Sequence, residues 1–250
     1  MTTPKMQATP HFRDLLTLPS RVAYLGWRTL RLQRRLAVHL KAGEEILLRP
    51  IPAEDYGAAR EVFVDLNYED PRDTGHPVRR IVDCGANIGC SCLYWARAYP
   101  GCQVEAFEPH PVHLELLREN LRRNHLEDQV RVHAVAVGVR AGQAFLSEQG
   151  LSSRVADAPQ AAGHHRIDVV DFFEMVGPEP IDLLKLDVEG SEYALLADAR
   201  FLSLRATTVV LEWHPTPAYP AESGRAWCQA RLEQAGYTVG EHKTLLWGWR

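Results

Sequence analysis

Several features are missing from these 250 residues, and each absence narrows the class of protein. No apolar run approaches the roughly 20 residues that a membrane-spanning helix needs. Residues 1–6 lack the apolar core of a secretion signal. The five cysteines form an odd set without the paired spacing of a zinc site. We therefore expect a cytoplasmic protein whose cysteines are small buried hydrophobic residues, without metal ligands or disulfides.

Charge is distributed unevenly along the chain. The first 50 residues hold nine Lys or Arg against three acids, which leaves a net charge of −10 on the other 200. This asymmetry predicts a basic, helical N-terminal extension over residues 1–52, followed by one domain over residues 53–250, with Pro50-Ile51-Pro52 as the hinge. Because the larger part is acidic, we do not expect a nucleic-acid partner.

Within the extension, residues 21–41 place apolar side chains at helical spacing among four arginines. The apolar positions are Val22, Leu25, Leu32, Leu36 and Leu40. The pattern predicts an amphipathic basic helix. Such a helix packs on the domain or on a second subunit as a homodimer, makes a weak contact with a membrane surface, or forms a collar for an acidic substrate. The sequence leaves these alternatives open.

A glycine-containing turn follows the first strand expected in the larger part. Residues 79–83 predict a short strand that ends on Asp83, and the apolar-rich segment after the turn predicts a helix. Gly85 and Gly89 can adopt backbone angles closed to most residues, and Asn87 tolerates the left-handed region. Ligands bind at such strand ends in open α/β sheets, so the turn indicates a nucleoside cofactor.

The spacing of the glycines distinguishes between cofactors. A dinucleotide site has the pattern Gly-x-Gly-x-x-Gly, which this turn lacks. Asp83 would repel a diphosphate but attract a cationic amino group, so the turn favours S-adenosylmethionine. The alternative is a helix-capping loop that carries an incidental acid.

A second carboxylate follows the next strand. Residues 102–107 predict an alternating strand that ends in Glu108-Pro109, 25 residues beyond Asp83. This offset is close to the roughly 20 residues at which a βαβ unit presents an acid to ribose hydroxyls. We therefore expect Glu108 to bind ribose, and we expect loss of Asp83 or Glu108 to weaken cofactor binding with little effect on the fold. A helix over 111–124 and one strand over 130–138 follow.

Two further strands end on polar residues. The strand expected at 181–186 ends at Asp187, and the strand at 207–211 ends near Glu212 and His214. In a doubly wound sheet both ends lie beside the cofactor turn. Alternation places Lys185 and Asp187 on one face, together with Glu189 while the chain stays extended. The alternative is a structural network in which Lys185 neutralises the acids.

Five blocks of sequence together resemble the FkbM-type family of S-adenosylmethionine-dependent methyltransferases. The blocks are residues 82–89, 106–111, 136–138, 181–192 and 209–214. The resemblance implies a class I Rossmann-like α/β fold, with a doubly wound, mostly parallel sheet. The helix and two strands expected over residues 221–249 fit the antiparallel C-terminal hairpin of such a sheet.

Carried onto the matching positions, the resemblance implies a set of cofactor-binding residues. They are Asp83, Gly85, Ala86, Asn87, Gly89, Glu108, Pro109, Ala136, Val137 and Asp187. The cofactor implied is S-adenosyl-L-methionine. The family most often methylates oxygen, but it spans natural-product, glycan and lipid acceptors, so the acceptor stays open.

Transfer of a methyl group to an aliphatic hydroxyl requires removal of a proton, and a positioned base contributes roughly 10²- to 10⁴-fold. His214 is the first candidate base because an ordinary imidazole titrates near neutrality, Asp187 is the second, and Glu212 completes the catalytic set. In an alternative scheme Asp187, Glu189 and Glu212 hold Mg²⁺, which would lower the pKa of the acceptor.

The sequence therefore predicts O-methylation of a small molecule such as a secondary metabolite or a sugar. Two alternatives stay open: methylation of an amine or carboxylate by the same fold, and a non-catalytic cofactor-binding protein that uses the basic helix as its interaction surface.

Overall fold

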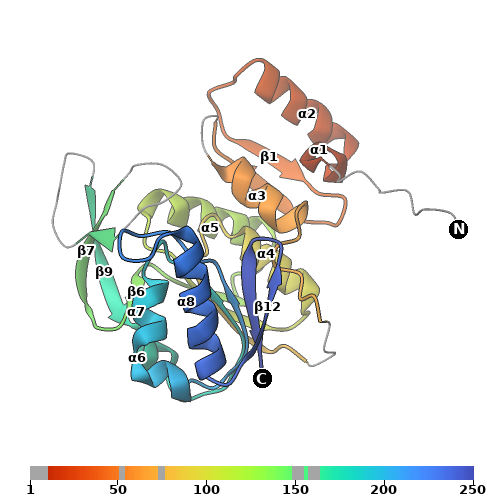
Figure 1. Cartoon of the computed structure of the whole chain (residues 1–250). Coiled ribbons are helices and arrows are strands. Elements are labelled where there is room, and N and C mark those ends of the chain that lie inside the picture. The colour runs from red at the N-terminus through yellow and green to blue at the C-terminus, as the bar shows by residue number, and fades with distance from the viewer. Residues whose placement is uncertain (1–10, 51–53, 73–76, 148–154, 157–163) are drawn as a thin grey trace, which may run out of the picture.

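A seven-stranded sheet forms the centre of the molecule (Figure 1). The computed structural model describes residues 11–50, 54–72, 77–147, 155–156 and 164–250. The strand order is β12-β13-β11-β10-β3-β4-β5. The strands are β3 (Arg80–Cys84), β4 (Gln103–Phe107), β5 (Val130–His133), β10 (Ile181–Leu186), β11 (Ala206–Leu211), β12 (Thr238–His242) and β13 (Leu245–Trp249). The first five are parallel and the last two form an antiparallel hairpin, which confirms the expected architecture.

Helices cover both faces of this sheet because neighbouring strand residues point to opposite sides. Ile81 belongs to a core shared with the N-terminal elements and with α3 (Asp55–Phe63), α4 (Cys90–Ala98) and α5 (Pro111–Arg123). Val82 belongs to the core of the other face. That face is covered by α6 (Phe172–Val176), α7 (Glu192–Ala197), the 3-10 helix η1 (Ala199–Ser203) and α8 (Ala221–Gln234). Apolar side chains on both faces explain why these strands read as nearly continuous hydrophobic runs.

After β5 the chain forms a second, smaller sheet. Its order is β6-β9-β7-β8, formed by β6 (Ala136–Gly138), β7 (Gly142–Ser147), β8 (Val155–Ala156) and β9 (His164–Asp171). The prediction of one strand over 130–138 was therefore wrong. His133 pairs with Phe107, the last residue of β4, so the following residues have no neighbour in the main sheet and β6 pairs with β9 instead.

The N-terminal part is a mixed structure rather than a helical one. It comprises α1 (Phe12–Leu15), α2 (Leu18–Thr29), β1 (Leu36–His39) and β2 (Glu45–Leu48). The prediction of a helix over 21–41 holds only to Thr29. Arg31 adopts a left-handed φ of 48°, and the indole N–H of Trp27 donates to the carbonyl of Arg34 at 2.6 Å. Pairing of β1 with β2 thus overrides the apparent helical spacing beyond this turn.

Two sets of contacts attach the N-terminal elements to the rest of the molecule. Tyr56 of α3 packs against the rings of Phe12 and Tyr24. The amide of the fully buried Asn120 on α5 accepts from the backbone N–H of Leu47 at 2.7 Å and donates to the carbonyl of Ile88 at 2.8 Å. The N-terminal elements and the glycine-containing turn after β3 are therefore both anchored on the side chain of Asn120. The predicted boundary at residue 52 lies outside the described residues.

Candidate active site

The glycine-containing turn after β3 has the backbone that its sequence predicts. Gly85 and Gly89 have φ of 89°, and Asn87 has φ of 50°. The N–H groups of Gly85 and Ala86 both donate to the carbonyl of Phe107, at 2.9 and 3.0 Å. A Cβ atom at Gly85 would lie 1.9 Å from the carbonyl oxygen of Asp187. The turn is therefore pressed against the end of β10, where glycine alone fits.

Asp83 lies in the core below this turn rather than at its surface. Its side chain is fully buried, and Oδ2 accepts from the hydroxyl of Ser91 at 2.5 Å. Its Oδ1 lies 3.3 Å from Nζ of Lys185. This position argues against the expected contact between Asp83 and the amino group of a cofactor. The pleat of β3 directs this carboxylate under α4, where it balances a buried cation.

Lys185 connects the turn to the end of β10. Its Nζ donates to the carbonyl of Gly85 at 2.8 Å and to Oδ2 of Asp187 at 3.0 Å. Burial disfavours the ammonium form, but Asp187, Tyr68 and Asp83 outweigh this cost and hold the pKa of Lys185 well above its usual value. The structural network that the sequence left open is thus present around Lys185, and it fixes the position of Asp187.

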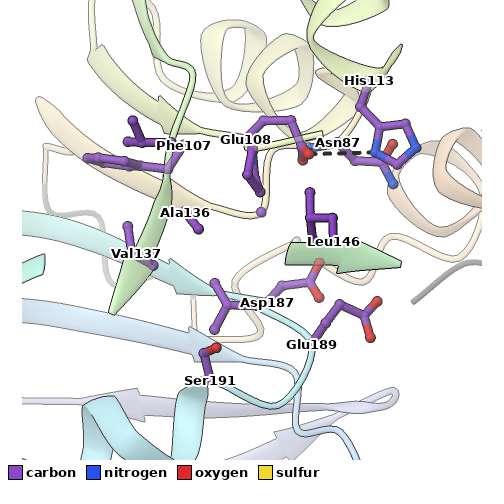
Figure 2. Close-up of a pocket in the computed structure, with 14 residues that line it drawn as sticks. Asn87, Phe107, Glu108, His113, Ala136, Val137, Leu146, Asp187, Glu189 and Ser191 are labelled. Atoms are coloured by element: carbon purple, nitrogen blue, oxygen red, sulfur yellow. Dashed lines mark hydrogen bonds and ion pairs between the residues drawn. The ribbon is translucent and has the colours of Figure 1, made fainter. Parts of the chain in front are cut away.

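The main cavity opens above the turn and has a volume of about 640 Å³, part of it open to solvent. Figure 2 shows Glu108 and Asn87 on one side of it, and Asp187 and Glu189 on the other. Oε2 of Glu108 accepts from the N–H of Asn87, and Oε1 accepts from the N–H of His110, both at 2.8 Å. Glu108 is thereby held at the cavity wall by two backbone donors.

A second hollow of about 330 Å³ lies beside the main cavity, and we call it the recess. Gly85, Asn87 and Asp187 line both spaces. The recess is also lined by Glu61 of α3 and by Tyr68, whose side chain is 5% exposed. Glu61 is open to solvent and has no ion pair within the described part of the chain. The surrounding protein and the charge of Asp187 raise its pKa.

His214 is surrounded by carboxylates. Its Nδ1 lies 3.2 Å from Oε1 of Glu192, and its Nε2 lies 3.5 Å from Glu189 and 3.8 Å from Asp187. Burial disfavours the charged imidazolium, but the hydrogen bond to Glu192 and the three negative charges raise the pKa of His214 to about 9. A pKa of about 9 favours the imidazolium form at neutral pH, which argues against His214 as the base.

Glu212, unlike His214, has a pKa close to neutral pH. Burial and the charge of Asp187 raise its pKa to about 7, although His214 opposes the shift. One ligand atom from each of Asp187, Glu212 and His214 lies within 4.8 Å of the others. The predicted metal set contained Glu189 in place of His214. Two cations already contact Asp187 in this cluster, Lys185 at 3.0 Å and His214 at 3.8 Å.

The structure brings most of the predicted cofactor residues together. Those that line the main cavity are Gly85, Asn87, Glu108, Pro109, Ala136, Val137 and Asp187. Ala86 lines the recess, and Gly89 is the N-cap residue of α4. Glu212 and His214 contact this site through Asp187 without lining either space. Sequence reasoning missed Glu61, Tyr68, His113 and Leu146 because they lie in no motif of the turn or of the strand ends. It also assigned no role to Ser191, although this residue lies in the block 181–192.

Known proteins are similar to this chain in sequence and in fold. It is 29% identical over 217 residues to methyltransferase sdnD of Sordaria araneosa, a match that covers 72% of this chain and 81% of that protein. It is 31% identical over 248 residues to 31-O-demethyl-FK506 methyltransferase FkbM of Streptomyces tacrolimicus, covering 84% and 89%.

Among solved structures, methyltransferase FkbM from Methylobacillus flagellatus superimposes with a TM-score of 0.50 at 21% identity. The match covers 69% of this chain and 44% of that one, and it identifies the fold as that of a class I methyltransferase. The profile of the methyltransferase FkbM domain matches residues 83–239, from Asp83 at the turn to β12. The chain therefore belongs to the FkbM family of methyltransferases.

Proposed function

We propose that this methyltransferase moves the methyl group of S-adenosylmethionine to a hydroxyl group of a small molecule. The observation that carries the proposal is the arrangement of acids around one turn. Glu108 stands on one side of Gly85 and Asn87, and Asp187 stands on the other. The recess with Glu61 continues from the same turn.

The residues present fit both the ribose and the amino-acid group of this cofactor. Each oxygen of Glu108 accepts one backbone N–H and retains a lone pair, which suits the two hydroxyls of a ribose. The recess offers the accessible carboxylate of Glu61 and the phenol of Tyr68, which suit the ammonium group of an amino acid. When bound, the cofactor supplies an activated methyl group. The protein then has to align the acceptor and remove its proton.

Asp187 is placed to meet the acceptor because it lines both spaces. Lys185 fixes one carboxylate oxygen at 3.0 Å, and the His214 cation stands 3.8 Å from the other. Asp187 thus orients the acceptor hydroxyl, and the proton passes to the carboxyl pair of Asp187 and Glu212. The pKa of Glu212, about 7, suits a group that accepts a proton near neutrality.

One relative supports oxygen as the acceptor atom. The Streptomyces tacrolimicus protein carries 31-O-demethyl-FK506 in its name.

The test is whether purified protein binds S-adenosylmethionine in calorimetry and converts it to S-adenosylhomocysteine with any of a panel of hydroxyl, amine and carboxylate acceptors. We expect binding, and turnover with hydroxyl compounds. Absence of binding would remove the cofactor from the proposal, and turnover restricted to amines or carboxylates would remove the hydroxyl.

A further inference from the structure

Helix α2 carries an apolar stripe on the side that faces away from the protein. Leu18, Val22 and Leu25 are 75%, 64% and 40% exposed, and their spacing of four and three residues places them on one face. The opposite face is buried through Tyr24 and Trp27, which are 2% and 3% exposed. The helix is therefore held in place by its inner face, and the outer stripe contributes nothing to packing.

No described residue covers this stripe. In Figure 1, α2 lies at the outer edge of the molecule, on the far side of β1 and α3 from the central sheet. At the C-cap of the helix, Leu30 is a further exposed aliphatic residue, 70% exposed. A contiguous set of exposed aliphatic residues on an outer helix is typical of an interaction surface.

The surroundings of the stripe are basic. Arg31 and Arg34 are exposed in the turn that follows the helix. Arg28, at the end of the helix, lies over the rings of Tyr24 and Tyr56. Arg21 lies beside the stripe, with its side chain 44% exposed. Residues 11–50 contain three acids, and of these Asp14 alone lies in α1 or α2, where it pairs with Arg21 at 3.6 Å. The surface thus combines aliphatic side chains with a rim of positive charge.

This charge decides between the occupants that such a face could take. A symmetric dimer would bury the stripe, but because both copies present the same basic surface it would leave the arginines without a partner of opposite charge. An anionic bilayer neutralises the arginines and accepts the aliphatic side chains at its boundary. We propose that α2 docks the protein on anionic phospholipid membranes, with Leu18, Val22 and Leu25 entering the interface.

The contact is peripheral, since none of the helices in the described ranges is long and apolar enough to cross a membrane. It also lies close to the site through α3. Tyr56 of α3 stacks on Tyr24 of α2 at 6.1 Å between ring centres, and Glu61 of the same helix lines the recess. The docked protein would therefore hold its cofactor recess one helix away from the lipid surface.

The experiment is co-sedimentation of the full chain with vesicles of pure phosphatidylcholine and with vesicles containing about one third phosphatidylserine. We expect binding to the anionic vesicles alone, and we expect it to weaken as salt rises from about 0.05 M to about 0.5 M. The double variant Leu18→Ser/Val22→Ser should bind at least about tenfold more weakly. Arg31→Gln/Arg34→Gln should lose about fivefold for each charge.

Matched controls separate this surface from general stickiness and charge. Leu202→Ser removes an aliphatic side chain that is 40% exposed on η1, and Arg79→Gln/Arg118→Gln removes two exposed charges elsewhere. Both should bind vesicles like the wild type. Equal binding by the α2 variants, no binding to anionic vesicles at low salt, or a dimer that the α2 variants dissolve would each overturn the proposal. All variants should keep the wild-type melting temperature because they lie on exposed faces.

Discussion

Glu192 and His214 are joined by two hydrogen bonds to one carboxylate oxygen. Oε1 of the fully buried Glu192 accepts from the backbone N–H of His214 at 2.7 Å and lies 3.2 Å from its Nδ1. Oε2 accepts from the N–H of Gly190 at 2.7 Å. One carboxylate therefore holds the turn after β10 and the residues after β11, and it keeps the imidazole protonated beside Asp187.

This pairing predicts a stability that falls in alkaline solution. The pKa of His214 is about 9 in the folded protein against 6.5 for a free imidazole, so its contribution is complete below about pH 6.5 and is lost as pH rises through 9. Between pH 6 and pH 10, urea unfolding of the wild type should lose up to about 3 kcal/mol more than that of His214→Gln. Identical pH dependence in the two proteins would contradict the assignment, as would an imidazole NMR titration near pH 6.5.

Glu212→Gln should remove the acid limb of the pH–rate profile. Glu212 must be ionised to take up a proton, so wild-type kcat should rise as pH increases through about 7. The variant should lose roughly 10²- to 10⁴-fold in kcat and show a flat profile in this range. Glu222→Gln on the exposed surface of α8 is the matched control and should behave as the wild type. A Glu212→Gln enzyme that retains both rate and limb would exclude the carboxyl pair as proton acceptor.

Asp83→Asn should destabilise the fold. The change leaves the buried ammonium of Lys185 with one carboxylate fewer, and breaking a buried ion pair costs about 3 to 5 kcal/mol. The double variant Asp83→Asn/Lys185→Met should regain part of this loss because it removes the uncompensated charge. Chemical denaturation without ligand measures both. If Asp83→Asn loses cofactor affinity at wild-type stability, the sequence-based role of Asp83 as a direct ligand is right instead.

Comparison of Glu108→Gln with Glu61→Gln separates a residue that both binds the cofactor and stabilises the fold from one that only binds the cofactor. Glu108→Gln should weaken S-adenosylmethionine binding and also lower stability by about 1.5 to 3 kcal/mol, since the carboxylate accepts N–H donors from two loops. Glu61→Gln should weaken binding by about tenfold, roughly the value of one charge-assisted hydrogen bond.

Stability distinguishes the two variants. The raised pKa of Glu61 means that its charge opposes folding near neutral pH, so Glu61→Gln should melt at or slightly above the wild-type temperature. Calorimetry and thermal denaturation give the two readouts. Loss of stability in Glu61→Gln, or wild-type affinity, would argue against a cofactor contact in the recess.

The parts of the site that follow strand ends could be predicted from sequence. Gly85, Asn87 and Glu108 follow apolar strands in a fixed order, and parallel strands bring such ends to one edge of the sheet. The direction of the Asp83 side chain could not be derived in the same way. Whether a residue near the end of a strand faces the ligand or the core depends on the register of the pleat against α4, and no local sequence pattern reports it.

Properties that depend on residues distant in the chain were the hardest to predict from sequence. The cation at His214 arises from Glu192, Asp187 and Glu189, which follow a different strand from His214 itself. Glu61 reaches the site because α3 packs over the turn. Similarly, the helical spacing of Leu32 and Leu36 gave way to a hairpin with β2, which lies beyond a helical window.

The close approach of Gly85 to the carbonyl of Asp187 limits how this enzyme can be redesigned. With 1.9 Å available where a Cβ would stand, neither position can drift in conformation without the other. Engineering of new acceptor choice should therefore leave this pair untouched and begin at Leu146 and Ser191, whose side chains line the cavity without fixing the turn. The part of the pocket around Gly85 and Asp187 is therefore fixed, and the part around Leu146 and Ser191 is open to substitution.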